Sequence, residues 1–205
     1  MENPSRSGIL LCVSGPSGVG KGTVIRCLRE QQPDLVHSIS ATTRAMRPGE
    51  SDGVSYHFVT RERFEQMIAA GEVLEYDEYC GNYYGTPLAP LTDALSSGSD
   101  VVMDVTVPGS LAVIDRMPDA VSIFLLPPSF AELRRRLEGR GTEPPDEMER
   151  RLEKARHEIR KASLFDYVVI NENVDRAAGQ ILAIAESERC RYTRIAGIED
   201  AILDI

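Results

Sequence analysis

The chain has 205 residues, of which 42% are hydrophobic and 27% charged, and its formal net charge is −9. This composition is ordinary for a globular domain and leaves enough length for one substantial core. The acidic balance argues against a protein that binds nucleic acid backbones, and no apolar stretch is long enough to cross a bilayer. We therefore expect no nucleic acid or membrane partner. Because the first residues lack the apolar core of a signal peptide, we also expect a cytoplasmic protein. Four scattered cysteines, without paired or zinc-type spacing, are expected to be free thiols: Cys12, Cys27, Cys80 and Cys190.

The first predicted elements are a strand over 9–14 and a helix over 22–31, joined by the glycine-rich segment GPSGVGKGT. A strand, Gly-x-x-x-x-Gly-Lys and a helix form the context of a phosphate-binding loop, with Gly15, Gly20 and Lys21 at its fixed positions. Backbone N–H groups would converge on phosphate oxygens there, and Lys21 would add a full charge. An ordinary glycine-rich turn is the alternative. Gly22 stands where a hydroxyl usually meets magnesium and Thr23 follows it, so a metal would be held mainly by phosphates and water.

Residues 38–98 do not continue this pattern of apolar strand and helix, because they are richer in Tyr, Thr, Gly and Pro and contain short alternating segments such as 54–59. We interpret them as an inserted subdomain. Arg44 and Arg47 could converge on one phosphate, since arginine suits a bidentate grip, although two arginines in a polar loop can also simply face water. In a strand, the adjacent tyrosines 83 and 84 would point one into the core and one into a cleft.

Three further apolar runs predict strands buried on both faces, over 101–105, 121–126 and 167–171. Helical patterns follow or flank them over 129–139, 146–164 and 176–188. Alternating strands and helices predict an α/β fold with a central parallel sheet. Glycines and prolines make 139–147 the expected mobile loop, and 194–205 is compatible with a short helix.

Four segments, together with the phosphate loop, resemble the guanylate kinase family of P-loop nucleoside monophosphate kinases in order and spacing: SISATTRAMRPGE, GNYYGTP, RLEGRGTEPPDEMERRLEKA and FDYVVINEN. The resemblance covers about residues 8–184. It implies an α/β P-loop kinase with a central parallel sheet flanked by helices, an inserted mixed α+β GMP-binding subdomain and a mobile lid. The implied organisation is one domain over 1–205, with its core at 8–37 and 99–184, the insert at 38–98, the lid at 138–152 and a C-terminal tail at 185–205.

The family's activity is phosphoryl transfer from ATP, with Mg²⁺, to GMP or dGMP. The resemblance implies an ATP site made by Gly15, Pro16, Ser17, Gly18, Val19, Gly20, Lys21, Gly22, Thr23 and Asn171. It also implies a GMP phosphate held by Arg44, Arg47, Tyr56 and Tyr84, and guanine read by Ser40, Glu75 and Thr86. The chemistry agrees, because guanine offers two donors that a carboxylate accepts together, whereas adenine would oppose it with a lone pair. Such a mismatch can reject a substrate by about 10⁴–10⁵-fold.

Positioning and charge neutralisation should carry the transfer, since a phosphate monoester is already mostly dianionic at neutral pH and needs no general base. The residues expected around the transferred group are Lys21, Arg44, Arg140 and Arg151, with Asp104 orienting magnesium-bound water. Asn171 would lie near adenine or else cap its own turn. We expect the histidines 37, 57 and 157 to be structural or exposed, arginines 134, 135 and 150 to be solvated, and leave Arg136 open.

The chain departs from the family after the strand 101–105. The family usually has a second carboxylate, near guanine and the metal, where this chain has Thr106, and a glutamine where it has Pro108. A changed acceptor, such as another nucleoside monophosphate or a sugar phosphate, is therefore one alternative. A non-enzymatic module binding peptides through the GMP site is another, although the intact phosphate loop argues against it. The sequence has no Asn-Lys-x-Asp element of a GTPase switch, and it leaves a homo-oligomer open.

Overall fold

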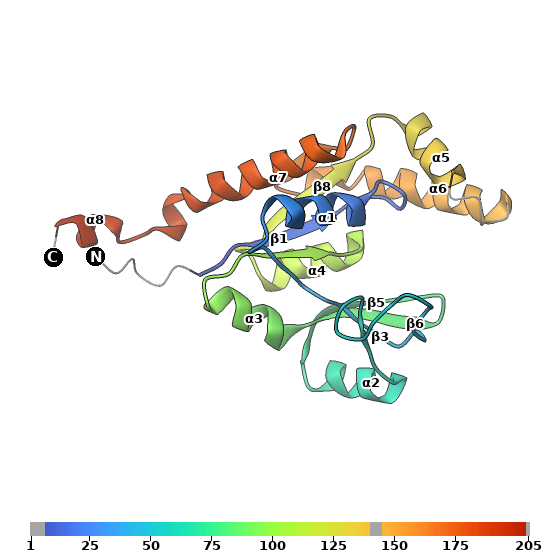
Figure 1. The fold of residues 1–205 in the computed structure, drawn as a ribbon, viewed down its shortest axis with the longest axis horizontal. Coiled ribbons are helices and arrows are strands. Elements are labelled where there is room, and N and C mark those ends of the chain that lie inside the picture. Colours follow the sequence, from blue (N-terminus) through green and yellow to red (C-terminus); the bar gives the residue numbers. More distant parts are fainter. Residues whose placement is uncertain (1–6, 140–144, 204–205) are drawn as a thin grey trace.

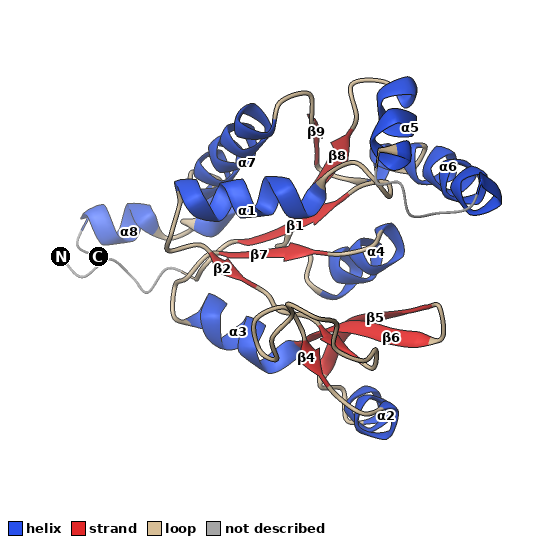
Figure 2. Ribbon diagram, turned by 45° about the vertical axis from the view of Figure 1, so that its right-hand side comes forward, coloured by secondary structure: helices blue, strands red, loops and turns tan. Residues whose placement is uncertain are grey.

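A five-stranded parallel sheet forms the centre of the computed structural model, which describes residues 7–139 and 145–203. The strand order is β2-β7-β1-β8-β9, so that β1 lies in the middle (Figure 2). The strands are β1 (Leu10–Ser14), β2 (Val36–His37), β7 (Val101–Asp104), β8 (Val121–Leu126) and β9 (Tyr167–Ile170). The four strands expected from continuous apolar runs are all present, and the parallel α/β fold is confirmed.

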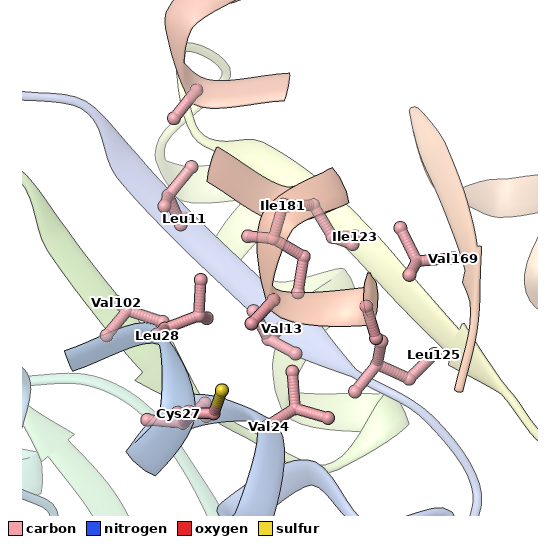
Figure 3. Close-up of a cluster of buried hydrophobic side chains, with 14 of the residues drawn as sticks. Leu11, Val13, Val24, Cys27, Leu28, Val102, Ile123, Leu125, Val169 and Ile181 are labelled. Carbon is pink, nitrogen blue, oxygen red and sulfur yellow. The ribbon is translucent and has the colours of Figure 1, made fainter. Parts of the chain in front are cut away.

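Helices cover both faces of this sheet (Figure 1). On one face, α1 (Lys21–Gln31) and α7 (Val174–Arg189) pack on side chains such as Leu11 and Val13, which lie in the buried cluster of Figure 3. On the other face, α3 (Leu88–Ser96) and α4 (Val107–Arg116) pack on the alternate residues of the same strand. Alternate side chains of β1 thus fill the cores on the two faces of the sheet. This packing holds the ends of the strands in place, and the loops that follow those ends can form a site.

Within the expected insert 38–98, residues 41–87 contain a second, mixed sheet with the strand order β4-β3-β6-β5, whereas α3 packs on the central sheet. Its strands are β3 (Ala41–Thr42), β4 (His57–Phe58), β5 (Val73–Tyr79) and β6 (Asn82–Pro87), and α2 (Arg61–Ala69) packs beside them through Phe64. The β3–β4 pair is parallel, whereas β6 is antiparallel to β3 and to β5. The inserted mixed α+β unit expected from the sequence is therefore present.

The remaining elements are two helices between β8 and β9 and the short elements that follow them and end the chain. Helices α5 (Phe130–Glu138) and α6 (Pro145–Ile159) pack on each other through Leu133, Leu137 and Leu152. The helix expected over 146–164 ends earlier, and a short 3-10 turn, η1 (Ala162–Leu164), follows it. Another turn, η2 (Tyr192–Arg194), and α8 (Ile198–Leu203) complete the chain.

One further boundary and one whole helix differ from the sequence expectation. Helix α7 continues through residue 184 to Arg189, so that the expected start of the tail falls inside a helix. Helix α4 occupies a segment for which the sequence indicated no element. Among the described residues, no helix combines the length and apolar character needed to span a membrane. All four cysteines are free thiols, as expected, with Cys12 and Cys27 buried.

Candidate active site

The glycine-rich segment forms a tight loop between β1 and α1. Gly20 precedes the helix with φ of 98°, a left-handed conformation that L side chains rarely adopt, and a Cβ there would lie 2.9 Å from Asn171 Nδ2. The helix begins at Lys21, so its first backbone N–H groups open toward the loop. The main-chain geometry that the glycine pattern predicted is therefore present, together with the positive end of a helix.

Lys21 lies between the loop and the end of a neighbouring strand. Its Nζ donates to the carbonyl oxygen of Gly15 at 3.3 Å and lies 3.8 Å from Asp104 Oδ1 at the end of β7. Desolvation by the surrounding protein raises the pKa of Asp104, and the Lys21 ammonium opposes that shift. The Asp104 side chain nevertheless keeps 37% of its surface exposed, so it is open to a ligand or to water.

One cleft of about 520 Å³ runs from this ion pair to the inserted subdomain. Lys21, Gly22 and Asp104 line its phosphate-loop side, and Val105 and Thr106 continue the lining after β7. On the insert side it is lined by Ser38, Ser40, Ser55, Tyr56, Glu75, Asp77, Tyr79, Tyr84 and Gly85, and on the α1 side by Ile25, Arg26, Arg29 and His37. The end of a phosphate loop and the expected guanine-reading residues Ser40 and Glu75 thus share one cavity.

Glu75 is a carboxylate in an unusual setting, because only 7% of its surface is exposed. The register of β5 against β6 shifts between Val73 and Tyr76, and such a bulge re-aims side chains. Thr86, which is 1% exposed, donates its hydroxyl to Glu75 Oε1 at 2.7 Å. Burial raises the pKa of Glu75 despite that hydrogen bond, and the charge of Asp77 adds to the increase. A buried acceptor of this kind favours a ligand with matching donors.

Arg44 and Arg47 lie in the loop after β3, and one glutamate holds both. The Arg44 guanidinium forms a bidentate pair with Glu50, at 2.9 and 2.8 Å, and the Arg47 backbone N–H donates to Glu50 Oε2 at 2.8 Å. Arg44 also lies 5.4 Å from the ring centroid of Tyr56, whose ring in turn contacts that of Tyr84. The structure therefore brings Arg44 and both tyrosines together, while the side chain of Arg47 is exposed.

The adjacent tyrosines divide as expected. Tyr84 lines the cleft, whereas Tyr83 stacks on Phe64 with ring centroids 5.2 Å apart. His57 is half-buried in β4, and His157 is mostly exposed beside Glu153.

Helices α5 and α6 contact the phosphate loop through arginines. Arg151 donates to Ser17 Oγ at 2.8 Å. Arg136, which the sequence left open, donates to the carbonyl oxygens of Val19 at 3.2 Å and of Asn171 at 2.9 Å. Arginines 134, 135 and 150 are surface charges: the first two pair with glutamates, and the third is exposed. Arg140 lies outside the described residues, as do the other residues of 140–144, which make up most of the loop expected over 139–147 and part of the lid expected over 138–152.

Asn171 follows β9 and is buried against the loop. Its Nδ2 donates to the carbonyl oxygen of Val19 at 2.8 Å, and its Oδ1 is buried without a hydrogen-bond partner among the described residues. This asparagine therefore supports the phosphate loop directly. The cap of the following helix is Asn173, whose side chain accepts from the Arg176 N–H.

Thr106 and Pro108, the two departures from the family pattern, both stand at the start of helix α4. Thr106 is its N-cap and accepts from the Gly109 N–H at 3.2 Å, and Pro108 stands in the first turn, where a missing N–H costs nothing. Thr106 also donates to Asp77 Oδ2 at 3.3 Å. A neutral hydroxyl at the cleft is thus bonded to a carboxylate from another element.

Sequence reasoning missed several residues of this cleft, notably Asp77, Tyr79 and His37. The first two follow Glu75 at every second position of β5, and all three side chains line the cavity. This alternation was readable once Glu75 had been placed in a strand. His37 ends β2, a two-residue strand that is too short for a pattern, and burial lowers its pKa.

The described residues offer few ligands for a metal. Among them, no group of three or more His, Cys, Asp or Glu side chains is arranged to hold an ion. A single exposed carboxylate, Asp104, lies beside Lys21, and Thr23 is an exposed hydroxyl at the start of α1. This donor set suits a magnesium ion that arrives with a nucleotide and is held mainly by phosphates and water.

Comparison with known proteins identifies the family. The family model described as guanylate kinase matches residues 7–188. Guanylate kinases of Halalkalibacterium halodurans and Lactococcus lactis are 48% and 49% identical over 188 residues, covering 92% of this chain and 92% of each relative. The crystal structure of guanylate kinase from Anaplasma phagocytophilum aligns with a TM-score of 0.77 at 34% identity, covering 95% of this chain and 93% of that one. The chain is therefore an enzyme of the guanylate kinase family.

Proposed function

We propose that the protein transfers the terminal phosphoryl group of ATP to GMP, and to dGMP, in line and without a general base. The observation that carries this proposal is the single cleft with Lys21 on one side and Glu75 on the other. ATP would lie with its phosphates on the loop amides and Lys21, and GMP with its base against Glu75. Their reacting ends would then meet between the two sheets.

Guanine selection would rest on Glu75 and its support. The N1–H and exocyclic amine of guanine are two parallel donors, and one carboxylate can accept both. Thr86 fixes that carboxylate through a 2.7 Å hydrogen bond, and Ser40 lines the same cavity. AMP would place a lone pair against a buried negative charge, and the resulting unpaired groups would reject it.

The GMP phosphate would be gripped by Arg44 and Arg47 with the hydroxyls of Tyr56 and Tyr84. In the structure Arg44 is paired with Glu50, so its guanidinium is already ordered close to both tyrosines. Phosphate binding would require the guanidinium to share or exchange this partner. Glu50 thus acts as a positioning residue that keeps Arg44 and the Arg47 backbone in one loop conformation.

Charge neutralisation would carry the transfer itself. Lys21 and Arg44 would face the transferred group from the two sides, and Arg151, which contacts Ser17 in the phosphate loop, would join them with Arg140. Magnesium bound with ATP would neutralise phosphate charge, and Asp104 would orient its water. Because the acceptor phosphate is mostly dianionic at neutral pH, no histidine is required as a base.

An acceptor panel tests this function. ADP release would be measured with GMP, dGMP, AMP, UMP and CMP for the parent chain and for the variants Lys21→Ala and Glu75→Gln. We expect activity with GMP and dGMP only, a near-total loss in Lys21→Ala, and weakened discrimination against AMP in Glu75→Gln. A parent chain that prefers another acceptor would indicate a kinase of the same fold with a changed substrate. No turnover with any acceptor would favour a binding module.

A further inference from the structure

Two carboxylates, rather than one, face the nucleotide cleft from strand β5. Glu75 and Asp77 are two residues apart, and both side chains line the cavity. Tyr79, two residues further along the strand, also lines it. Glu78, which lies between Asp77 and Tyr79, is exposed on the opposite face of the strand, and its carboxylate lies 3.9 Å from the Arg61 guanidinium.

The Asp77 carboxylate is held in place by two donors. Its Oδ1 accepts from the Glu78 backbone N–H at 2.8 Å, and its Oδ2 accepts from the Thr106 hydroxyl at 3.3 Å. Thr106 is itself fixed, because it is the N-cap of α4 and accepts from the Gly109 N–H. A carboxylate oxygen can accept two hydrogen bonds, so each oxygen of Asp77 retains capacity for a ligand.

A second carboxylate beside Glu75 is costly in a site for anionic nucleotides. Two carboxylates that line one cavity repel each other, and each also repels a phosphate. This repulsion is offset when the bound ligand donates additional N–H groups to the two carboxylates. Guanine has three donors on this edge: N1–H and the two protons of the exocyclic amine. Glu75 can accept N1–H and one amine proton, which leaves the other amine proton without an acceptor.

We propose that Asp77, oriented by the hydroxyl of Thr106, accepts the remaining proton of the guanine 2-amino group and thereby reads the base together with Glu75. The spacing suits this assignment. Two acceptors bonded at about 2.9 Å to one nitrogen, about 120° apart, lie about 5 Å from each other. Alternate residues of a strand have Cα atoms about 6.7 Å apart, and side chains of unequal length can close the difference. This inference rests on the proposed function of the site and extends its specificity.

The test compares GMP with IMP, which has the same ribose and phosphate and lacks only the 2-amino group. Dissociation constants for both nucleotides would be measured by calorimetry on the full chain and on Asp77→Asn, which keeps the shape of the side chain and removes its charge. We expect GMP binding to weaken about 10- to 100-fold, as for loss of a hydrogen bond to a charged group, with IMP binding changed less than about twofold. Glu78→Gln, which removes one charge from the opposite face of the same strand, should change neither.

Thr106 provides the second arm of the test. Thr106→Val should lower the preference for GMP over IMP, and Thr106→Ser, which keeps the hydroxyl, should retain it. Combined with Asp77→Asn, the effect of Thr106→Val should be less than additive, because both act through one acceptor. The ratio of two dissociation constants is insensitive to the lost helix cap, which lowers stability without selecting between bases.

Equal changes for GMP and IMP in Asp77→Asn would overturn the inference, since they would place Asp77 against the ribose or phosphate. Unchanged binding of both would overturn it as well. ADP release by the parent chain with GMP separates this outcome from a failure of the proposed function. A chain that binds GMP selectively through Asp77 but releases no ADP would contradict the phosphotransferase alone.

Discussion

Gly109 is the position at which a single methyl group should disturb base recognition without disturbing the fold. It lies in the first turn of α4, directly behind the buried carboxylate of Glu75. A Cβ at residue 109 would stand 2.5 Å from Glu75 Oε2, whereas ordinary van der Waals contact begins near 3.4 Å. The oxygen must therefore retreat by about 0.9 Å, the difference between those two distances. The clash falls on the end of a side chain and not on the backbone, so the carboxylate should move while the backbone stays.

The expected consequence of Gly109→Ala is a loss of GMP affinity with retained stability. A hydrogen bond to a charged group contributes about 1.5–3 kcal/mol, so a misplaced carboxylate should raise KM for GMP about 10- to 100-fold. Alanine in a helix is favoured over glycine by about 0.5–1 kcal/mol, which offsets part of any strain. Steady-state ADP release at varied GMP would give KM, and thermal unfolding would give the stability.

Gly179→Ala is the matched control, because Gly179 is an exposed glycine in helix α7 whose Cβ would meet no heavy atom within 4 Å. It should gain a similar helix preference and leave KM unchanged. If Gly109→Ala kept KM for GMP within about twofold of the parent, the position of the Glu75 carboxylate would not matter for acceptor binding. The assignment of Glu75 to guanine would then be wrong.

Three further outcomes follow from the charges of the cleft. Lys21→Ala should lower kcat by at least about 10²-fold, while calorimetry finds GMP binding unchanged, because Lys21 lies on the phosphate-loop side of the cleft. An equally large loss of GMP binding would contradict the assignment of Lys21 to the ATP side. The raised pKa of Glu75 means that the folded chain binds its proton more tightly than the unfolded chain, so this group's contribution to stability falls as pH rises from the ordinary glutamate pKa through the raised value. Glu75→Gln should therefore raise the melting temperature at pH 7.5, with the gain lost near pH 4; destabilisation at both pH values would show that burial of the charge carries no cost. His37→Gln should leave kcat within about threefold and the pH–rate profile unchanged between pH 6 and 8, whereas loss of an ionisation from that profile would make His37 a base.

Continuous apolar runs and the glycine pattern made much of the core predictable. Strands such as Val121–Leu126 are buried on both faces, so each appears in the sequence as a continuous apolar run that predicts a strand without information from the rest of the chain. Helix α4 gave no such signal, because its first turn contains Pro108 and Gly109, residues that resemble a loop in sequence. Proline is tolerated there since the N–H that it lacks would have no helical partner, and glycine is needed because of Glu75.

The residues that complete the cleft could not be read from local pattern. Asp77 and Thr106 are 29 positions apart and meet only because β5 of the insert lies against the start of α4. A two-residue strand such as the one ending at His37 is below the length at which periodicity is visible. The pairing of Arg44 with Glu50 is local, yet a string of polar loop residues does not show which carboxylate an arginine selects.

A crystal structure with GMP and a non-hydrolysable ATP analogue bound together would test the central claim most directly. The account predicts the guanine edge within hydrogen-bond distance of Glu75 and the terminal phosphate of the analogue at Lys21, with the GMP phosphate between them beside Arg44. Guanine bound away from Glu75, or a GMP phosphate out of reach of the analogue while the loop is occupied, would contradict it.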